Sequence, residues 1–225
     1  MRDGRMHVIV TAGPTREYLD PVRFLSNPST GKMGFAIAAE AARRGHEVTL
    51  VAGPVALKTP KGVERVDVVS AREMLSAVEA ALGDSKRTTA REAVLIATAA
   101  VADWRPARCA AKKLKKGEMS GVLKLVRNPD ILKAVDSYRK RSKAVGLRTV
   151  GFAAETDHVL GEAARKCREK GLEFIVANDV TKKGCGFGTD TNRVTFVFPG
   201  GTLKKFPMMT KRMVAKRILD EVSRL

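Results

Sequence analysis

Short apolar runs alternate along this chain with longer segments in which apolar residues recur at helical spacing. Glycine, proline or polar residues bound each run, and the pattern therefore predicts buried strands. The predicted strands are residues 7–11, 47–52, 63–69, 93–97, 149–152 and 174–177. The predicted helices are residues 35–44, from 70 toward 82, about 158–170, and from 210 to about 224.

Local signals support several helix ends. Gly45 follows the first helical segment as a C-terminal stop. Ser70 and Glu73 have the spacing of a capping box at the start of the second helix. Thr210 precedes the last helix as an N-cap.

Strands that alternate with helices of this length form parallel βαβ units, and these wind into one open sheet with helices on both faces. Residues 193–198 and 203–206 flank the sequence PGGT and predict a terminal β-hairpin. No repeat or linker divides the chain. We therefore predict a single domain over residues 1–225, with an α/β, Rossmann-like, doubly wound and mostly parallel sheet. Residues 105–121 are basic and lack an obvious element, which makes them a candidate flap.

Composition narrows the class of protein. Of the 225 residues, 44% are hydrophobic, which excludes a disordered chain. No apolar run approaches the length of about 18 residues that spans a bilayer, and the N-terminus does not have the pattern of a signal peptide. Cys109, Cys167 and Cys185 stand far apart, without zinc-ligand or disulfide spacing. These features predict a cytoplasmic protein with no membrane partner.

Charge raises one alternative function. The chain carries 42 Lys and Arg against 24 Asp and Glu, a formal charge of +18. A basic surface attracts phosphate, so a nucleic-acid-binding protein is one hypothesis. Aromatic residues make up only 5% of the chain and do not alternate with basic ones, which leaves few platforms for base stacking. Nucleic acid is therefore disfavoured as a partner, and an anionic small-molecule substrate or a solubilising surface explains the same charge.

In doubly wound sheets, ligands bind beyond the carboxyl ends of the strands. The first loop there, TAGPTREYLDPVRFLSNPSTGKMG at residues 11–34, ends in Ser29, Thr30, Gly31 and Lys32 before a predicted helix. A helix N-terminus approached in this way favours an anion, although a plain loop with an N-cap has the same pattern. No GxGxxG or Walker sequence is present.

Two further loops carry candidate polar groups. In ATAAVADWRP, at residues 97–106, small residues leave room for a flat ring, and Asp103 can accept hydrogen bonds from a ribose or base. The lysines of KKLKK, at residues 112–116, suit the charge of a triphosphate. The alternatives are a capped turn and a solvated basic loop.

Two segments later in the chain complete the candidates. In GFAAET, at residues 151–156, Phe152 can stack on a base, and Lys166 and Lys170 share one face of the next helix. A core phenylalanine and solvated lysines are the alternatives. After IVANDV, the glycines of residues 184–192 predict a tight turn without an assigned ligand.

Taken together, these segments resemble the phosphopantothenoylcysteine synthetase family, whose members form an amide in coenzyme A biosynthesis. They occur in the family's order and cover nearly the whole chain. The matching segments are TAGPTRE…DPVRFLSNPSTGKMGFAIA, VAGP, ATAAVADWRP, KKLKK, VRNPDIL, VGFAAET, IVANDV and FGTDTNRV.

The resemblance implies a phosphopantothenate–cysteine ligase that works in two halves. CTP would activate the carboxylate of 4′-phosphopantothenate as an acyl-cytidylate with release of pyrophosphate, and the amine of cysteine would then displace CMP. Animal relatives use ATP, but the lysine pattern favours CTP. The resemblance also implies Mg²⁺ on the nucleotide phosphates and a homodimer in which a flap or edge segment reaches the partner's site. In many bacteria a flavin-dependent decarboxylase precedes this domain; that portion is not present here, so no FMN is expected.

The resemblance assigns roles to individual residues. Asn27 matches the asparagine at the acyl-phosphate, and Lys113 matches the first lysine of the family's KxKK motif, which supports activation of the carboxylate. Lys113 also belongs to the nucleotide ligands. The remaining nucleotide ligands are Ala97, Thr98, Ala99, Asp103, Asn128, Pro129, Asp130, Ile131, Phe152, Lys166 and Lys170. No metal ligand is assigned.

An NAD(P)-dependent reductase on the same fold is the other alternative. The missing glycine fingerprint disfavours it. A Tyr-x-x-x-Lys pair is also missing, because Val22 and Ser142 stand four residues after Tyr18 and Tyr138.

Overall fold

The structure, a computed structural model, describes residues 4–83, 92–115, 117, 121–142, 146–155, 159–179 and 188–225. Parts of six predicted segments lie outside these residues. They are Lys116 of the basic loop, residues 116 and 118–120 of the candidate flap, Thr156 of GFAAET, residue 158 of the predicted helix, Val180 of IVANDV and residues 184–187 of the glycine-rich turn.

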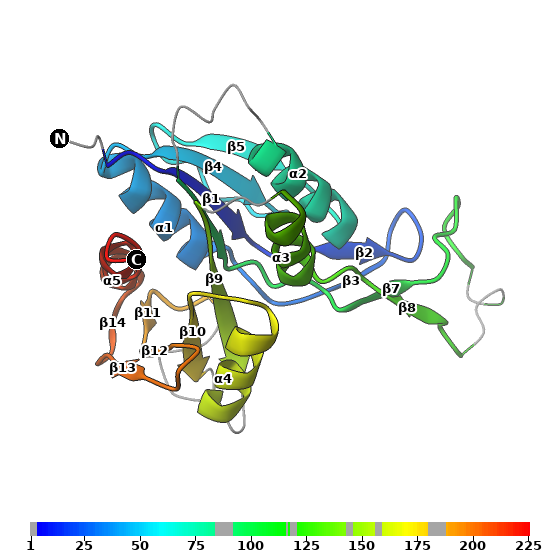
Figure 1. Ribbon diagram of the computed structural model, residues 1–225. Helices are drawn as coiled ribbons and strands as arrows, with labels where there is room; N and C mark the ends of the chain where they lie inside the picture. Colours follow the sequence, from blue (N-terminus) through cyan, green and yellow to red (C-terminus); the bar gives the residue numbers. More distant parts are fainter. Residues whose placement is uncertain are drawn as a thin grey trace.

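An eight-stranded sheet forms the centre of the fold (Figure 1), in the order β13-β12-β10-β9-β6-β1-β4-β5. Its parallel strands are β1 (His7–Ala12), β4 (Glu47–Ala52), β5 (Glu64–Asp67), β6 (Ala93–Ala97), β9 (Leu147–Glu155) and β10 (Phe174–Asp179). The antiparallel pair β12 (Val194–Val197) and β13 (Leu203–Lys205) closes one edge. The predicted Rossmann-like sheet and its terminal hairpin are confirmed.

Helices cover both faces of this sheet (Figure 1). They are α1 (Lys32–Arg43), α2 (Ala71–Gly83), α3 (Ile131–Ser142), α4 (Val159–Glu169) and α5 (Lys211–Val222). Helices α1 and α5 pack on each other and bury Val8 and Val10 of β1, whereas Ile9 between them faces α2 and α3. Strands covered on both faces have continuous apolar runs, which is why the sequence pattern located them.

Three features of the helices differ from the prediction. Helix α1 begins at Lys32, three residues before the predicted start, directly after Gly31 at a φ of 76°. Helix α3 was not predicted. The capping box of α2 is present in modified form, because Glu73 N donates to Ser70 Oγ over 3.3 Å while the Glu73 carboxylate accepts from Val69 N.

Two small hairpins extend from the sheet as an arm (Figure 1), which we define as residues 16–26, 104–115, 117 and 121–127. The hairpins pair β2 (Arg16–Tyr18) with β3 (Phe24–Ser26) and β7 (Trp104–Pro106) with β8 (Leu125–Arg127). The predicted flap therefore has an element at its start, since strand β7 covers its first two residues. A last short pair, β11 (Thr191–Asn192) and β14 (Met209–Thr210), precedes α5.

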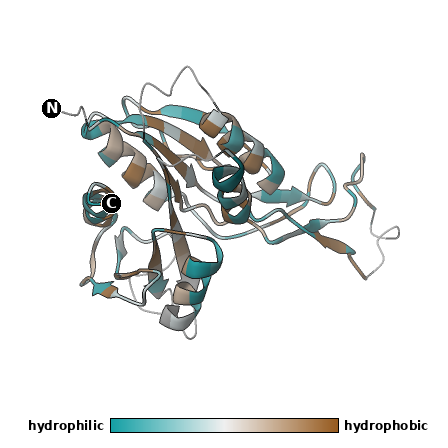
Figure 2. Cartoon of the chain, viewed as in Figure 1, coloured by the Kyte–Doolittle hydropathy of each residue, from teal (hydrophilic) through white to brown (hydrophobic). Residues whose placement is uncertain are grey.

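Hydropathy follows this layering. Figure 2 shows hydrophobic residues along the central strands and hydrophilic residues on the outer faces of the helices. Within the described ranges, every helix is too short or too polar to span a membrane.

Candidate functional site

The carboxyl ends of β1 and β6 lie side by side where the strand order reverses, with β4 and β5 on one side and β9 and β10 on the other. Sheets of this topology open a crevice at such a point. The loops that leave the two strands stay hydrogen-bonded to each other: Thr98 N donates to Thr11 O over 3.2 Å and Ala100 N to Gly13 O over 2.9 Å. A cavity opens on each side of these loops, and Ala99, Val101 and Phe152 line both. We call these three residues the shared wall.

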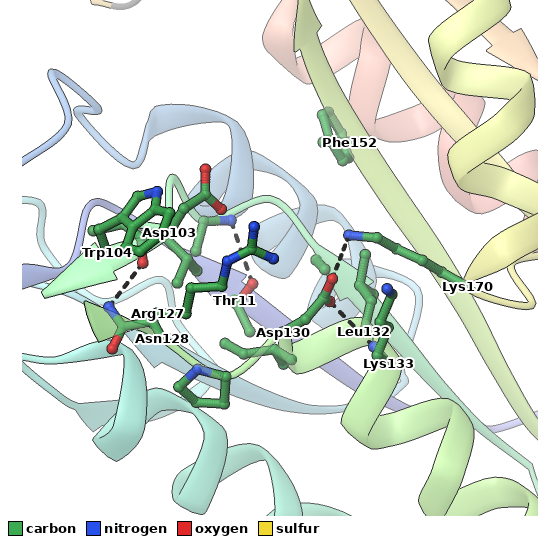
Figure 3. A pocket seen from close by; sticks show the side chains of 16 residues that line it. Thr11, Asp103, Trp104, Arg127, Asn128, Asp130, Leu132, Lys133, Phe152 and Lys170 are labelled. Atoms are coloured by element: carbon green, nitrogen blue, oxygen red, sulfur yellow. Dashed lines mark hydrogen bonds and ion pairs between the residues drawn. The ribbon is translucent and has the colours of Figure 1, made fainter. Parts of the chain in front are cut away.

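The first cavity, of about 540 Å³, collects most of the residues assigned to the nucleotide (Figure 3). The predicted residues that line it are Ala97, Ala99, Asp103, Asn128, Pro129, Asp130, Ile131, Phe152 and Lys170. They come from the ends of β6 and β9, the start of α3 and the residue after α4. Segments far apart in sequence thus meet at one edge of the sheet, as the topology requires.

Asn128 holds the loop between β8 and α3 against the loop after β6. Its Nδ2 donates to Ala102 O over 2.8 Å, its backbone N donates to Asp103 O over 2.8 Å, and its Oδ1 accepts from Arg105. Because these bonds use the amide in the protein's own structure, Asn128 shapes the cavity through its backbone position.

Asp130 starts helix α3 and also pairs with α4. Its Oδ1 accepts from Lys133 N over 3.2 Å, the pattern of an N-cap. Its Oδ2 lies 2.9 Å from Lys170 Nζ, and Figure 3 shows the two side chains facing each other. The cavity therefore has a cation at its edge that is already neutralised by a neighbouring carboxylate.

Sequence reasoning missed two basic residues of this cavity. Arg127 and Lys133 line it, and the guanidinium of Arg127 lies 5.2 Å from the ring centroid of Trp104. Arg127 enters the site through the pairing of β7 with β8, for which the sequence carries no local signal. A prediction of helix α3 would have placed Lys133 in the site. The signals for that helix are Asp130 at the N-cap position and the apolar spacing of Ile131 and Val135.

The second cavity, of about 410 Å³, opens at the N-terminus of α1. Residues 27–34 line it, together with Thr98, Phe152 and residues near the start of α5. Gly34 allows the close approach of the helix to the sheet, since a Cβ there would lie 2.5 Å from Ala12 Cβ. The predicted helix N-terminus therefore does face a cavity.

Asn27 lines the second cavity next to the shared wall. Its Nδ2 donates to Ala100 O over 3.1 Å and to Val101 O over 3.3 Å. These contacts turn the NH₂ group of the amide toward the backbone of the loop after β6. The group that Asn27 offers to a ligand is therefore the acceptor Oδ1.

Two lysines stand at the start of helices beside the second cavity. Lys32 Nζ donates to Asp190 Oδ1 over 2.7 Å and to Gly188 O over 2.9 Å, and Lys211 Nζ donates to Thr189 O. Burial, and next the nearby charge of Lys32, lower the pKa of Lys211. Lys32 holds the pKa of the Asp190 carboxyl below its ordinary value. Lys32, Lys211 and two helix N-termini outweigh the single carboxylate of Asp190, which makes this end of the cavity favourable for an anion.

Asn192 adds a buried acceptor to the same cavity. It is 5% exposed, and its Oδ1 has no hydrogen-bond partner within the described part of the chain. Its Nδ2 contacts Met33 Sδ over 3.9 Å.

The single chain does not bring all predicted residues together. Lys166 lies half-buried on α4, one turn before Lys170, and lines neither cavity. Lys113 is exposed on the arm and also lines neither of them. Asn27 and Thr98 belong to the second cavity, and Phe152 and Ala99 connect it with the first.

The fold and this pair of cavities define an α/β protein whose candidate binding site lies at the switch point of a Rossmann-like sheet. The sequence profile of the family described as "DNA/pantothenate metabolism flavoprotein C-terminal domain" matches residues 4–225, and the chain belongs to this family.

Known relatives agree with this assignment. The chain is 45% identical over 220 residues to the coenzyme A biosynthesis bifunctional protein CoaBC of Escherichia coli K12, an alignment that covers 96% of this chain and 51% of the relative. It is 44% identical over 220 residues to CoaBC of Bacillus subtilis, with 97% and 51% covered. The chain thus spans about half the length of the curated relatives it matches.

The chain also matches a solved structure of the corresponding domain alone. The crystal structure of the C-terminal domain of CoaBC superposes with a TM-score of 0.78 at 38% identity, covering 99% of this chain and 97% of that one.

Proposed function

We propose that this chain is a phosphopantothenate–cysteine ligase, which joins 4′-phosphopantothenate and cysteine in the cytoplasm after activation by CTP. One observation carries the proposal: two cavities meet at the shared wall of Ala99, Val101 and Phe152. A ligase of this kind must bring the α-phosphate of a nucleotide to a carboxylate, and adjoining sites supply that proximity. The similarity to the C-terminal domain of CoaBC over nearly its whole length supports the same assignment.

We assign the first cavity to CTP. The small side chains after β6 let the base and ribose approach the backbone, and Asp103 and Phe152 offer an acceptor and a ring face. Arg127 and Lys133 contribute positive charge for the phosphates, whereas Lys170 is paired with Asp130. Lys166 lies on α4, one turn before Lys170. It stays a predicted ligand of the nucleotide.

We assign the second cavity to 4′-phosphopantothenate. Its phosphate fits the N-terminus of α1, where Lys32 and Lys211 lie, and its carboxylate then points toward the shared wall. One carboxylate oxygen attacks the α-phosphorus of CTP, and pyrophosphate leaves.

Asn27 acts in the second half of the reaction. The cysteine amine attacks the acyl carbon and gives up a proton to water, the bond from that carbon to the oxygen of the cytidylate breaks, and CMP leaves with the oxygen. Asn27 Oδ1 accepts a hydrogen bond from the incoming amine and so orients its lone pair toward the carbon. A neutral amide does this without adding charge beside two anions.

Magnesium enters with the nucleotide in this proposal. Among the described residues, no three His, Cys, Asp or Glu side chains lie close enough to form a metal site. Mg²⁺ commonly rests on substrate phosphates with one or two carboxylates and several waters. Asp103 and Asp130 are the carboxylates of the first cavity, and the ion supplies charge neutralisation on the phosphates.

We also propose that the chain works as a homodimer in which the arm of one subunit serves the site of the other. The arm presents exposed apolar side chains, and these suit contact with a second copy. They are Val22, Phe24, Trp104, Val122, Leu123 and Leu125. Such an arrangement brings Lys113, which is remote from both cavities of its own chain, to the partner's nucleotide.

The proposal is tested by pyrophosphate release from purified protein with 4′-phosphopantothenate and either CTP or ATP, with and without cysteine. We expect release with CTP, and product only when cysteine is added. Lys113→Gln should lower pyrophosphate release at least a hundredfold, because it removes a cation from the activation step. Asn27→Asp should still release pyrophosphate but accumulate the acyl-cytidylate.

Lys112→Gln is the matched control, since it removes an equal charge from the neighbouring exposed position. It should keep activity near that of the wild type. Activity within tenfold of wild type in both Asn27→Asp and Lys113→Gln would contradict the assignment.

A further inference from the structure

Asp20 lies in the turn between β2 and β3, and although it is a carboxylate its side chain is fully buried. One of its oxygens closes this turn: Oδ1 accepts from Val22 N and from Arg23 N, each over 2.9 Å. A turn of this kind needs only one side-chain oxygen. The second oxygen, Oδ2, is therefore available for another contact.

That second oxygen reaches the other hairpin of the arm. Asp20 Oδ2 accepts from Leu114 N over 3.2 Å and from Arg23 Nη2 over 2.5 Å. The same Arg23 Nη2 donates to Leu114 O over 2.8 Å. Both backbone polar groups of Leu114, 94 residues away in sequence, are thus held by the Asp20–Arg23 pair. Ala110 N adds a further link by donating to Leu19 O over 2.8 Å.

The hydrogen bonds from Arg23 also hold the pKa of Asp20 well below its ordinary range. Asp20 consequently stays ionised at neutral pH, and charge-assisted hydrogen bonds of this kind are stronger than neutral ones.

Leu114 is the residue that follows Lys113. Consecutive Cα atoms lie about 3.8 Å apart, so a fixed Leu114 backbone fixes where the Lys113 side chain begins. The side chains alternate here, with Leu114 partly buried and Lys113 exposed. The contact therefore orders the backbone of the basic loop while leaving the ammonium group of Lys113 accessible.

We propose that Asp20 is a positioning residue that acts through Lys113, by holding the backbone of the basic loop in the place from which that lysine reaches the activated carboxylate. This inference rests on the role of Lys113 in the proposed function. It assigns to the turn between β2 and β3 a part in the first half-reaction, although Asp20 lines neither cavity.

Asp20→Asn separates this role from simple closure of the turn. The asparagine oxygen can replace Oδ1 and keep the bonds to Val22 N and Arg23 N. Its NH₂ group then replaces Oδ2 and faces the N–H donors of Leu114 and Arg23, which is a donor-to-donor contact. The variant keeps the turn but releases the loop.

The first measurement is amide hydrogen exchange at Leu114 in the protein without ligands. We expect exchange at least tenfold faster in Asp20→Asn than in wild type. Glu40→Gln is the matched control, because Glu40 is also a buried carboxylate paired with arginine but lies on α1, away from the arm. Unchanged exchange at Leu114 in Asp20→Asn would overturn the proposed contact, whatever the enzyme's activity.

The second measurement is a double-mutant cycle on pyrophosphate release. Asp20→Asn alone should lower the rate about a hundredfold, the effect expected of a misplaced catalytic group. In the Lys113→Gln background it should lower the rate less than about twofold, because the residue through which it acts is gone. Multiplying effects in the double variant would show a general structural role and overturn the inference.

Two further outcomes are distinguishable. If wild-type protein releases no pyrophosphate with any nucleotide, the proposed function fails, while exchange at Leu114 still decides the contact.

If Asp20→Asn does not fold, Leu114→Pro removes the N–H donor of the loop and leaves residues 19–23 intact. Wild-type pyrophosphate release in Leu114→Pro would overturn the inference.

Discussion

At the scale of single residues, Glu40 joins two helices through an arginine. Its carboxylate is 5% exposed and accepts from Arg43 over 2.7 Å and from Arg44 over 2.9 Å. Arg44 in turn donates to Asp220 Oδ1 over 2.8 Å, which connects α1 to α5. Protonation of this buried carboxylate leaves the arginines without their partner charge, which strongly destabilises the folded state.

Stability should consequently depend on pH through Glu40. Hydrogen bonds from Arg43 lower the pKa of Glu40 from 4.5 to about 2, so the unfolded chain takes up the proton first as the pH falls. The contribution is complete above pH 4.5 and is lost as the pH falls through about 2. We expect the free energy of unfolding, measured by urea denaturation across this range, to fall more steeply for wild type than for Glu40→Gln. Parallel pH curves would contradict this origin.

At the scale of elements, the position of the start of α1 depends on Gly34, which lies against the ends of β1 and β6. A Cβ at Gly34 would lie 2.5 Å from Ala12 Cβ and 2.6 Å from Thr98 Oγ1. Helix α1 therefore packs directly on the ends of β1 and β6. This close packing brings its N-terminus to the second cavity.

Gly34→Ala should push α1 away from the sheet. We expect a loss of about 1–3 kcal/mol in the free energy of unfolding, as in other overpacked sites, and a raised KM for 4′-phosphopantothenate. Gly161→Ala is the matched control, because Gly161 is also the third residue of its helix but a Cβ there meets nothing within 4 Å. That variant should gain up to about 1 kcal/mol. Equal effects of the two substitutions on denaturation would show that the close approach is unimportant.

The sequence predicted those elements whose signals are local. Strands β4 and β6 were located to the residue, since burial on both faces makes most positions of β4 and all of β6 apolar. Helix α3 was missed because lysines and arginines fill its exposed face and partly hide the apolar spacing of Ile131 and Val135. Strands β2, β3, β7 and β8 have three residues each and depend on partners far along the chain, so local patterns do not predict them.

The same distinction applies to the site. Motif resemblance predicted Asp103, Asn128 and Phe152, which do gather at the first cavity. It assigned Lys113 to the nucleotide and the basic segment to a flap, but not the place of Lys113 outside both cavities of its own chain, because the placement of the arm depends on contacts between two hairpins.

At the scale of the whole molecule, an arm that serves a neighbouring subunit predicts complementation between inactive variants. Asn27→Asp and Lys113→Gln each disable every site of a homodimer. In a mixed dimer, however, one site combines an intact Asn27 with an intact Lys113 from the other subunit. After unfolding and refolding an equimolar mixture, about a quarter of wild-type activity should return, since half of the dimers are mixed and each has one working site.

Two controls complete this measurement. Activity here means formation of the cysteine amide, because Asn27→Asp still releases pyrophosphate. Each variant refolded alone should form almost none of this product, and sedimentation should show dimers in every sample. Dimers that regain no activity on mixing would place Lys113 in the site of its own chain.

The shared wall also has a consequence for ligand chemistry. Ala99, Val101 and Phe152 line both cavities, so groups bound on either side of them are close neighbours. Two weakly held fragments, one in each cavity, would therefore gain affinity when joined by a short tether across Ala99. Once one end is bound, the tether presents the other at an effective concentration of about millimolar.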